Sequence, residues 1–160
     1  MTSAERLVSA LISRGLSVGT CESLTGGRVC AALTSVPGSS ATVRGGLLTY
    51  ATDLKTRLAG VSERVIADEG VVSEAVASAM ATGAQKALSC DVVLACTGVA
   101  GPGPQDGVPA GTVWIAVATP GRVSTRRLAI EGDREAVRAG TVQALLDLVL
   151  LELGPESIEA

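Results

Sequence analysis

The chain of 160 residues contains no histidine and no phenylalanine, and Trp114 and Tyr50 are its only aromatic residues. Without histidine, neither a Ser-His-Asp triad nor a Cys/His zinc site can form. With two aromatic rings and a net charge of -3, the chain lacks the stacking surface and the positive charge that nucleic-acid-binding proteins use. Nucleic acid is therefore not an expected partner.

Long hydrophobic runs are also absent. The apolar stretches Val92 to Cys96 and Val113 to Ala118 are far shorter than the roughly 20 residues of a membrane-spanning helix. The first residues do not resemble a signal peptide. We therefore expect a soluble, cytoplasmic protein that does not contact membranes. Its length fits one domain over residues 1–160 with a core that needs no disulfide or metal.

The four cysteines form no C-x-x-C pair, so we expect neither a metal nor another cofactor. They are Cys21, Cys30, Cys90 and Cys96. A reduced cysteine in an apolar segment acts as a small hydrophobic residue, which is the favoured interpretation here. A reactive thiol at Cys21 or Cys96 is the weakest of three site hypotheses, because no histidine can hold a thiolate.

Hydrophobic periodicity and turn residues predict alternating helices and strands. The predicted helices are Ala4 to Arg14, Arg28 to Val36, Asp53 to Leu58, Ser73 to Ser89 and Asp133 to Leu153. The predicted strands are Ser17 to Cys21, Arg44 to Thr52, Asp91 to Thr97, Gly111 to Thr119 and Arg122 to Ile130. The tail from Gly154 to Ala160 is expected to fray. This order indicates an α/β fold: a three-layer α/β/α sandwich with a mixed, mostly parallel sheet of about five strands and a hairpin in the C-terminal half.

Three unusual loops follow predicted strands: Ser23 to Gly27, Tyr50 to Lys55 and Thr97 to Gly107. Ligands of such sheets bind outside the carboxyl ends of the strands, so these loops are candidates to meet at one site. Lys55 is one of two lysines in the chain, and a lysine loses its proton readily when it is buried. It is therefore a candidate base, although a solvated helical Lys55 and a half-buried Tyr50 are the alternative interpretation.

Six motifs occur in order over nearly the whole chain. They are E-S-x-T-G-G at Glu22 to Gly27, G-S-S at Gly38 to Ser40, G-G-x-x-T-Y-x-x-x-x-K at Gly45 to Lys55, T-G-x-A-G-P at Thr97 to Pro102, G-T-V-W-I-A at Gly111 to Ala116 and G-D-R-E at Gly132 to Glu135. Together they resemble the CinA C-terminal domain, the nicotinamide mononucleotide amidohydrolase family. The resemblance implies deamidation of nicotinamide mononucleotide to nicotinate mononucleotide and ammonia, in pyridine-nucleotide salvage, by the stand-alone form of the family.

The resemblance also implies the residues of the site. Its catalytic group maps to Ser40, Tyr50 and Lys55, with Ser23 as the competing nucleophile. Thr97 and Arg134 map to the substrate pocket, and we also expect Thr25, Gly26, Gly27, Gly98 and Gly101 to contact the substrate. A serine activated by a neutral lysine, with a tyrosine that relays protons, supplies the chemistry of amide hydrolysis without histidine.

Several alternatives stay open at this point. The helix that follows Gly27 is expected to bind either the substrate phosphate or the oxyanion at its N-terminus. The glycines also serve turns that need positive φ, and Arg134 also suits a surface ion pair with Glu131 or Glu135. Family members commonly have cysteine where this chain has Leu24, and the loop after Thr97 is short and lacks a lysine before its proline.

Rival functions are a nucleotide-binding module without activity, an amidase for another substrate and, ranked lower, a dinucleotide-binding oxidoreductase. A symmetric homodimer is the expected assembly.

Overall fold

The computed structural model describes residues 1–154. The tail predicted to fray, Gly154 to Ala160, lies outside the described residues apart from Gly154. Its centre is a five-stranded sheet in the order β2-β1-β3-β4-β5. The strands are β1 Val18–Glu22, β2 Val43–Leu48, β3 Val92–Gly98, β4 Thr112–Thr119 and β5 Arg122–Ala129. β2, β1 and β3 pair in parallel, whereas β4 is antiparallel to both of its neighbours. Four of the five strands therefore run in one direction.

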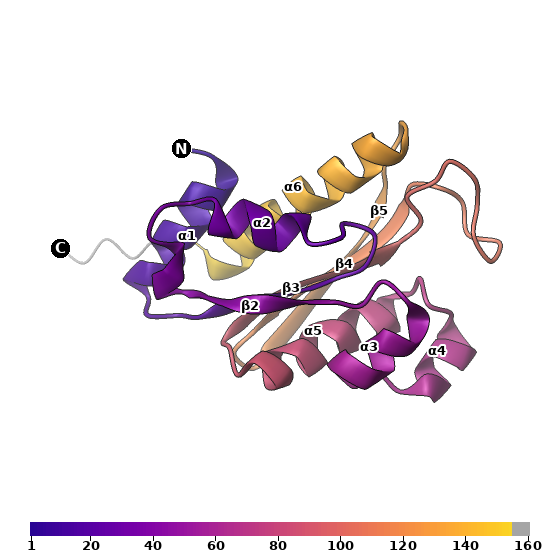
Figure 1. Ribbon diagram of the computed structural model, residues 1–160, viewed down its shortest axis with the longest axis horizontal. Helices are drawn as coiled ribbons and strands as arrows, with labels where there is room; N and C mark the ends of the chain where they lie inside the picture. Colours follow the sequence, from indigo (N-terminus) through magenta and orange to yellow (C-terminus); the bar gives the residue numbers. More distant parts are fainter. Residues whose placement is uncertain (155–160) are drawn as a thin grey trace.

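Helices cover both faces of the sheet, as Figure 1 shows. One layer holds α1 Ser3–Ser13, α2 Arg28–Thr34 and α6 Arg134–Leu153, and the other holds α3 Thr52–Ala59, α4 Glu63–Glu69 and α5 Glu74–Leu88. Each layer packs on its own apolar cluster. The fold is thus the predicted three-layer α/β/α sandwich with a mixed sheet and the hairpin β4–β5. Among the helices of residues 1–154, none combines the length and the apolar character of a membrane span.

The burial of strand β1 reflects the helices that cover both faces of the sheet. All five of its residues are buried, and it lies between β2 and β3. In a strand covered on both faces, every residue is buried, whereas a strand covered on one face alternates between buried and exposed residues. The edge strand β2 instead alternates between half-buried and exposed residues.

Gly83 sets how closely the helices on the α5 side approach each other. A β-carbon at Gly83, on α5, would lie 1.6 Å from the carbonyl oxygen of Ala59, the last residue of α3. Only glycine therefore permits this contact between α3 and α5. The contact matters for function because α3 carries Lys55.

Two predictions about the elements are wrong. The sequence predicted no helix between Leu58 and Ser73, yet α4 Glu63–Glu69 forms there. This helix has seven residues and buries none of them completely, so it leaves almost no apolar periodicity. The second strand was predicted to continue to Thr52 but ends at Leu48, because Thr52 already begins α3.

Candidate active site

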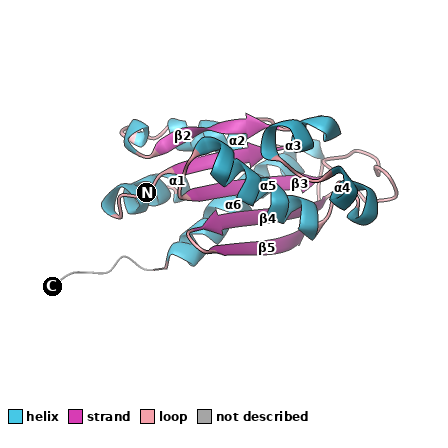
Figure 2. Cartoon of the chain, turned by 90° about the horizontal axis from the view of Figure 1, so that it is seen from below, coloured by secondary structure: helices cyan, strands magenta, loops and turns pink. Residues whose placement is uncertain are grey.

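The three loops singled out in the sequence meet at one edge of the sheet. Ser23 follows β1, Tyr50 follows β2, and Thr97 lies near the end of β3. Because these strands are parallel neighbours, their carboxyl ends lie side by side, near α3 and α4 in Figure 2. A cavity of about 360 Å³ lies there. Its size is within the range of small-molecule sites, and its position is the one at which open α/β sheets bind ligands.

Both helical layers contribute to the cavity wall. Val71 and Val72, which precede α5, line one side, and Arg134, the first residue of α6, lines the other. The outer rim is the chain segment 98–105, in the loop that projects from the sheet between β3 and β4 in Figure 1. The site is therefore built from the carboxyl ends of the strands and from both helical layers that cover the sheet.

Ser23 and Lys55 form the central polar pair of the cavity. The Lys55 ammonium donates to the Ser23 hydroxyl oxygen at 3.1 Å and to the backbone carbonyls of Thr49 and Tyr50 at 2.6 and 3.5 Å. Ser23 is 8% exposed and Lys55 only 1% exposed. A lysine from α3 is thus folded inward against a serine that follows β1.

The surroundings of Lys55 favour its neutral form. All three of its hydrogen-bond partners are oxygens of uncharged groups. Burial lowers the pKa of the Lys55 amine below its ordinary value of 10.5. The prediction of a solvated Lys55, kept as an alternative, is therefore wrong. A neutral amine at this position can accept the proton of the Ser23 hydroxyl.

Tyr50 and Arg134 lie together at the mouth of the cavity. Arg134 donates to the carbonyl oxygen of Gly101 at 2.8 Å and to the Tyr50 hydroxyl at 3.3 Å. Tyr50 is 64% exposed, so its ring lines the entrance rather than the core. A guanidinium has five N–H donors, and these two contacts leave donors for an anionic ligand. The alternative of an ion pair between Arg134 and Glu135 does not form, since Glu135 pairs with Arg28 instead.

Thr97 and Gly98 form the floor of the cavity at the end of β3. The Thr97 hydroxyl donates to the carbonyl oxygen of Val71 at 2.9 Å, which ties the loop before α5 to the sheet. At Gly98, a β-carbon would lie 2.8 Å from the carbonyl oxygen of Thr112. Thr97 therefore has a structural contact, and Gly98 is required by the close approach of β4.

Ser40 is not part of this site. It is exposed on the short 3-10 helix η1 Ser39–Ala41, which precedes β2 and does not line the cavity. Tyr50 follows the opposite end of β2, so the six residues of that strand separate the two side chains. At about 3.3 Å per residue, the strand alone spans roughly 20 Å. The sequence-based choice of Ser40 over Ser23 as nucleophile is therefore inconsistent with the geometry of this chain.

Glu22 occupies the helix N-terminus that was expected to bind an anion. Its carboxyl group accepts hydrogen bonds from the backbone N–H groups of Val29 and Cys30, at 2.8 and 3.0 Å, and from the hydroxyls of Thr25 and Thr20, at 2.7 and 3.1 Å. Glu22 is 0% exposed. The first turn of α2 is thus satisfied inside the protein and has no donors left for phosphate or an oxyanion.

Thr25, Gly26 and Gly27 consequently have structural roles. The Thr25 side chain is buried and bonded to Glu22, and none of the three residues lines the cavity. Gly26 and Gly27 have φ values of 60° and 98°, which a tight turn into α2 requires. The prediction that they bind substrate finds no support in this arrangement. Sequence reasoning missed Glu22, although its signal was present: a charged residue at the end of a strand that is otherwise buried.

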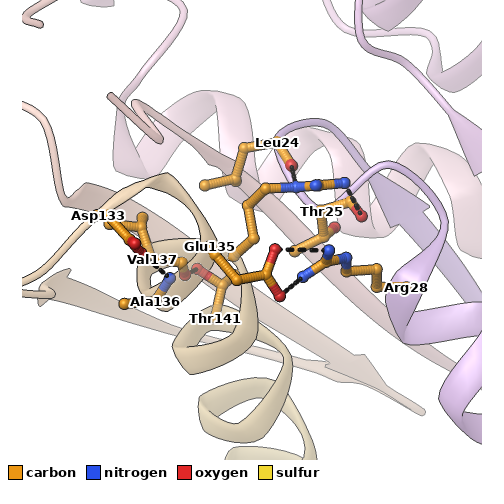
Figure 3. Close-up of polar contacts among 9 residues, drawn as sticks. Leu24, Thr25, Arg28, Asp133, Glu135, Ala136, Val137 and Thr141 are labelled. Carbon is orange, nitrogen blue, oxygen red and sulfur yellow. Dashed lines mark hydrogen bonds and ion pairs between the residues drawn. The ribbon is translucent and has the colours of Figure 1, made fainter. Parts of the chain in front are cut away.

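The start of α6 is tied to this same loop, as Figure 3 shows. Arg28 and Glu135 form a bidentate ion pair, with distances of 2.7 and 2.8 Å. Arg138 donates to the carbonyl oxygens of Leu24 and Thr25 at 2.9 and 3.3 Å. Nothing in the sequence singled out Arg138, because its partners are backbone groups more than a hundred residues away.

Burial disfavours the thiolate form of the cysteines. Cys21 and Cys96 are fully buried, and burial raises the pKa of Cys21 to about 12 and the pKa of Cys96 to about 11. Cys30 and Cys90 also have raised pKa values, again mainly because of burial. The hypothesis of a thiol nucleophile at Cys21 or Cys96 therefore finds no support in this arrangement. Within residues 1–154, no group of three or more His, Cys, Asp or Glu side chains is arranged to hold a metal ion.

The fold and the site define a histidine-free α/β/α protein in which a serine and a buried lysine meet at the carboxyl ends of parallel strands. The chain belongs to the CinA C-terminal domain family, whose model matches residues 1–153.

Two relatives match the chain over most of their own length. A nicotinamide-nucleotide amidohydrolase PncC of Pseudomonas putida is 46% identical over 156 residues, which are 97% of this chain and 97% of that protein. The nicotinamide-nucleotide amidohydrolase PncC of Escherichia coli K12 is 44% identical over 140 residues, or 86% of this chain and 85% of that protein. A CinA-like protein of Frankia casuarinae is 43% identical over 143 residues, or 89% of this chain, but the chain spans about a third (33%) of that longer protein.

Solved structures agree with the fold. The crystal structure of a competence-damaged protein (CinA) superfamily protein from Klebsiella pneumoniae is 36% identical, with a TM-score of 0.91 over 94% of this chain and 95% of that one. A protein of the same superfamily from Escherichia coli is also 36% identical, with a TM-score of 0.91 over 95% of this chain and 88% of that one.

Proposed function

We propose that this chain is an amidohydrolase that converts nicotinamide mononucleotide to nicotinate mononucleotide and ammonia, with Ser23 as nucleophile. The observation that carries the proposal is the hydrogen bond of 3.1 Å between the buried Lys55 amine and the Ser23 hydroxyl. Two relatives named nicotinamide-nucleotide amidohydrolase support the substrate.

The first half of the reaction forms an acyl-enzyme. Neutral Lys55 accepts the proton of the Ser23 hydroxyl while the oxygen attacks the carboxamide carbon of the substrate. The resulting tetrahedral intermediate collapses when its C–N bond breaks. The proton held by Lys55 passes to the leaving nitrogen, with the Tyr50 hydroxyl as relay at the cavity mouth, and ammonia departs.

The second half returns the enzyme to its starting state. A water molecule attacks the acyl carbon and gives up its proton to Lys55. The bond between the carbon and the Ser23 oxygen breaks, and the proton returns to that oxygen, which leaves nicotinate mononucleotide. Arg134 binds the phosphate of the substrate, since it has unused N–H donors beside the cavity.

The test is ammonia release from nicotinamide mononucleotide by the parent chain, Lys55→Met and Lys86→Met. The chain has two lysines, and the exposed Lys86 provides a matched control for the same substitution. We expect activity in the parent and in Lys86→Met, and its loss in Lys55→Met. Nicotinate mononucleotide should appear in amounts equal to ammonia. A parent chain that binds the nucleotide but releases no ammonia would identify a binding module instead.

The alternative with the same chemistry is an amidase that acts on a different amide substrate. Inorganic phosphate and nicotinate mononucleotide should both compete with the substrate if Arg134 binds a phosphate. An amidase for a substrate without phosphate would be insensitive to inorganic phosphate at concentrations that inhibit the nucleotide reaction.

Three expectations from the sequence belong with this proposal. They are a place in pyridine-nucleotide salvage, a cytoplasmic location and a symmetric homodimer. The dimer is tested by the mass of the purified protein in solution, for which light scattering after size-exclusion chromatography is sufficient. A monomeric mass with full activity would remove any need for a second chain.

A further inference from the structure

Amide hydrolysis at Ser23 places negative charge on the carbonyl oxygen of the substrate, and enzymes stabilise that charge with N–H donors fixed in advance. Several donors near the cavity already have partners. The N–H groups of Val29 and Cys30 donate to Glu22, and the remaining donors of Arg134, at the cavity mouth, are assigned to the substrate phosphate. Neither the start of α2 nor the lysine itself offers an obvious donor for the oxyanion.

One backbone donor directly beside Ser23 is free. Within residues 1–154, the Leu24 N–H makes no hydrogen bond to another protein group. Leu24 lines the cavity, although the residue as a whole is only 3% exposed, and it belongs to the apolar cluster between the sheet and the layer of α1, α2 and α6. Because this cluster encloses the side chain, we take the backbone of Leu24 as the part that borders the cavity beside Ser23.

The turn after Ser23 determines where this N–H points. The Ser23 carbonyl accepts a hydrogen bond from the Gly26 N–H at 3.1 Å, which closes a turn with Leu24 as its second residue. In a planar trans peptide, the N–H points opposite to the carbonyl of the same unit. Because the Ser23 carbonyl faces into the turn, the Leu24 N–H faces out of it.

Arg138 holds the next two peptide units. Its guanidinium, half-buried on α6, donates to the Leu24 carbonyl at 2.9 Å and to the Thr25 carbonyl at 3.3 Å. The carbonyls of Ser23, Leu24 and Thr25 are thus all hydrogen-bonded, and the peptide units cannot rotate without loss of these bonds. A donor fixed in this way costs no reorganisation during the reaction.

We propose that the Leu24 N–H is the oxyanion donor of this site, and that Arg138 is the positioning residue that keeps it directed at the carbonyl oxygen of the substrate. The proposal rests on the proposed function, in that it assumes acyl transfer to Ser23. It concerns a backbone group and a side chain that no motif in the sequence marked.

The direct test compares Leu24→Pro with Leu24→Ala. Proline deletes the N–H and suits the second position of a turn, whereas alanine keeps the N–H and loses the side-chain packing. Relative to Leu24→Ala, we expect kcat of Leu24→Pro to fall about 100-fold or more, with KM within about twofold, the effect typical of a lost oxyanion donor. Equal kcat values in the two variants would overturn the proposal.

The role of Arg138 is tested by Arg138→Met, with Glu135→Gln as control. Both changes weaken contacts between α6 and the chain around α2, but only the first releases the loop carbonyls. We expect kcat of Arg138→Met to fall about tenfold or more at every pH, with an unchanged midpoint of the pH profile, because Lys55 is not touched. Arg138→Lys should restore little, since an ammonium lacks the planar fork that spans two carbonyls. A rise in KM alone, or a shifted midpoint, would contradict positioning of the oxyanion donor.

A simple activated ester separates this inference from the proposed function. Release of p-nitrophenol from p-nitrophenyl acetate requires only acyl transfer to Ser23. If the parent chain hydrolyses this ester but not nicotinamide mononucleotide, the proposed substrate is wrong, and the ratio of Leu24→Pro to Leu24→Ala on the ester still decides the oxyanion role. A parent chain without activity on either compound would refute both proposals.

Discussion

The Lys55 amine lies 3.1 Å from the Ser23 hydroxyl, although the two residues are 32 positions apart and come from different elements. No carboxylate is among the hydrogen-bond partners of this amine. Burial of a charged lysine without a carboxylate partner costs free energy, which favours the neutral amine. A general base must be in this neutral form. In the proposed mechanism, the pair takes in a histidine-free chain the role that a serine and a histidine have in other hydrolases.

The first prediction distinguishes the two serines. Ser23→Ala should abolish ammonia release from nicotinamide mononucleotide, because it removes the only serine hydroxyl that contacts Lys55 in the described chain. Ser40→Ala should keep activity within about twofold, since Ser40 is exposed before β2. Steady-state kinetics of the two variants, with circular dichroism as a check of folding, is the measurement. Loss of activity in Ser40→Ala alone would restore the assignment made from the sequence.

The second prediction concerns pH. Burial lowers the pKa of Lys55 below 10.5, and the base is active only when neutral. Activity of the parent should therefore rise with pH through this lowered pKa, at a midpoint below that of a free lysine. Lys55→Arg should be nearly inactive and show no such rise, because arginine stays charged. The check is kcat/KM measured from pH 6 to 10 in buffers of constant ionic strength.

The same titration has a consequence for stability, which is the third prediction. The folded state has the lower pKa, so between the two pKa values the unfolded state binds more protons, and stability rises with pH. Lys55→Met removes the buried ammonium and should be as stable as the parent at pH 7, or more stable by up to about 4 kcal/mol. The advantage should shrink as pH approaches 10.5. Urea unfolding of both proteins at several pH values measures it, and an advantage that grows with pH would contradict the assignment.

Much of this arrangement was predictable from local patterns. The order of strands and helices followed from periodicity and from turn residues, and the parallel pairing of the strands before Ser23, Tyr50 and Thr97 then required their loops to meet. The inward position of Lys55 was one of two interpretations. Periodicity could not decide between them, because α3 has only eight residues and a modest apolar face.

The errors about the site have a common physical origin in long-range contacts. Ser40 and Ser23 each lie within three residues of a glycine, and only the direction of β2 separates Ser40 from the site. From the sequence, the N-terminus of the helix after Gly27 was expected to have free N–H groups. In the structure, the carboxyl group of Glu22 accepts hydrogen bonds from two of them. Side chains that satisfy backbone groups across the fold, as Arg138 does, have no signature in sequence spacing.

The fourth prediction assigns the phosphate of the substrate to Arg134. Arg134→Gln should raise KM for nicotinamide mononucleotide about tenfold or more, the equivalent of about 1.4 kcal/mol for a lost charge-assisted hydrogen bond. It should have little effect on the riboside that lacks the phosphate. Arg57→Gln, at an exposed arginine of α3 paired with Asp53, is the control and should leave both KM values unchanged. Equal losses for nucleotide and riboside would show that Arg134 acts only through Tyr50 and Gly101.

The fifth prediction concerns the buried carboxyl group beneath the site. In Glu22→Gln, an amide with a single acceptor oxygen replaces a group that accepts from two backbone N–H groups, one on each oxygen. Threonine hydroxyls can reverse their direction, but a backbone N–H cannot, so the new NH₂ must face either Val29 or Cys30. Leaving such a buried donor unsatisfied costs about 1 to 3 kcal/mol.

Denaturant unfolding of Glu22→Gln and Glu135→Gln makes a matched comparison, since both changes replace a hydrogen-bonded glutamate by glutamine. Glu135 is exposed and its ion pair with Arg28 is screened by solvent, so its loss should barely change the free energy of unfolding. Glu22→Gln should also lower kcat, because the turn that holds Ser23 is anchored through the bond from Thr25 to Glu22. If the two variants were equally stable and equally active, the carboxyl group would be dispensable, and the first turn of α2 would be free to bind an anion after all.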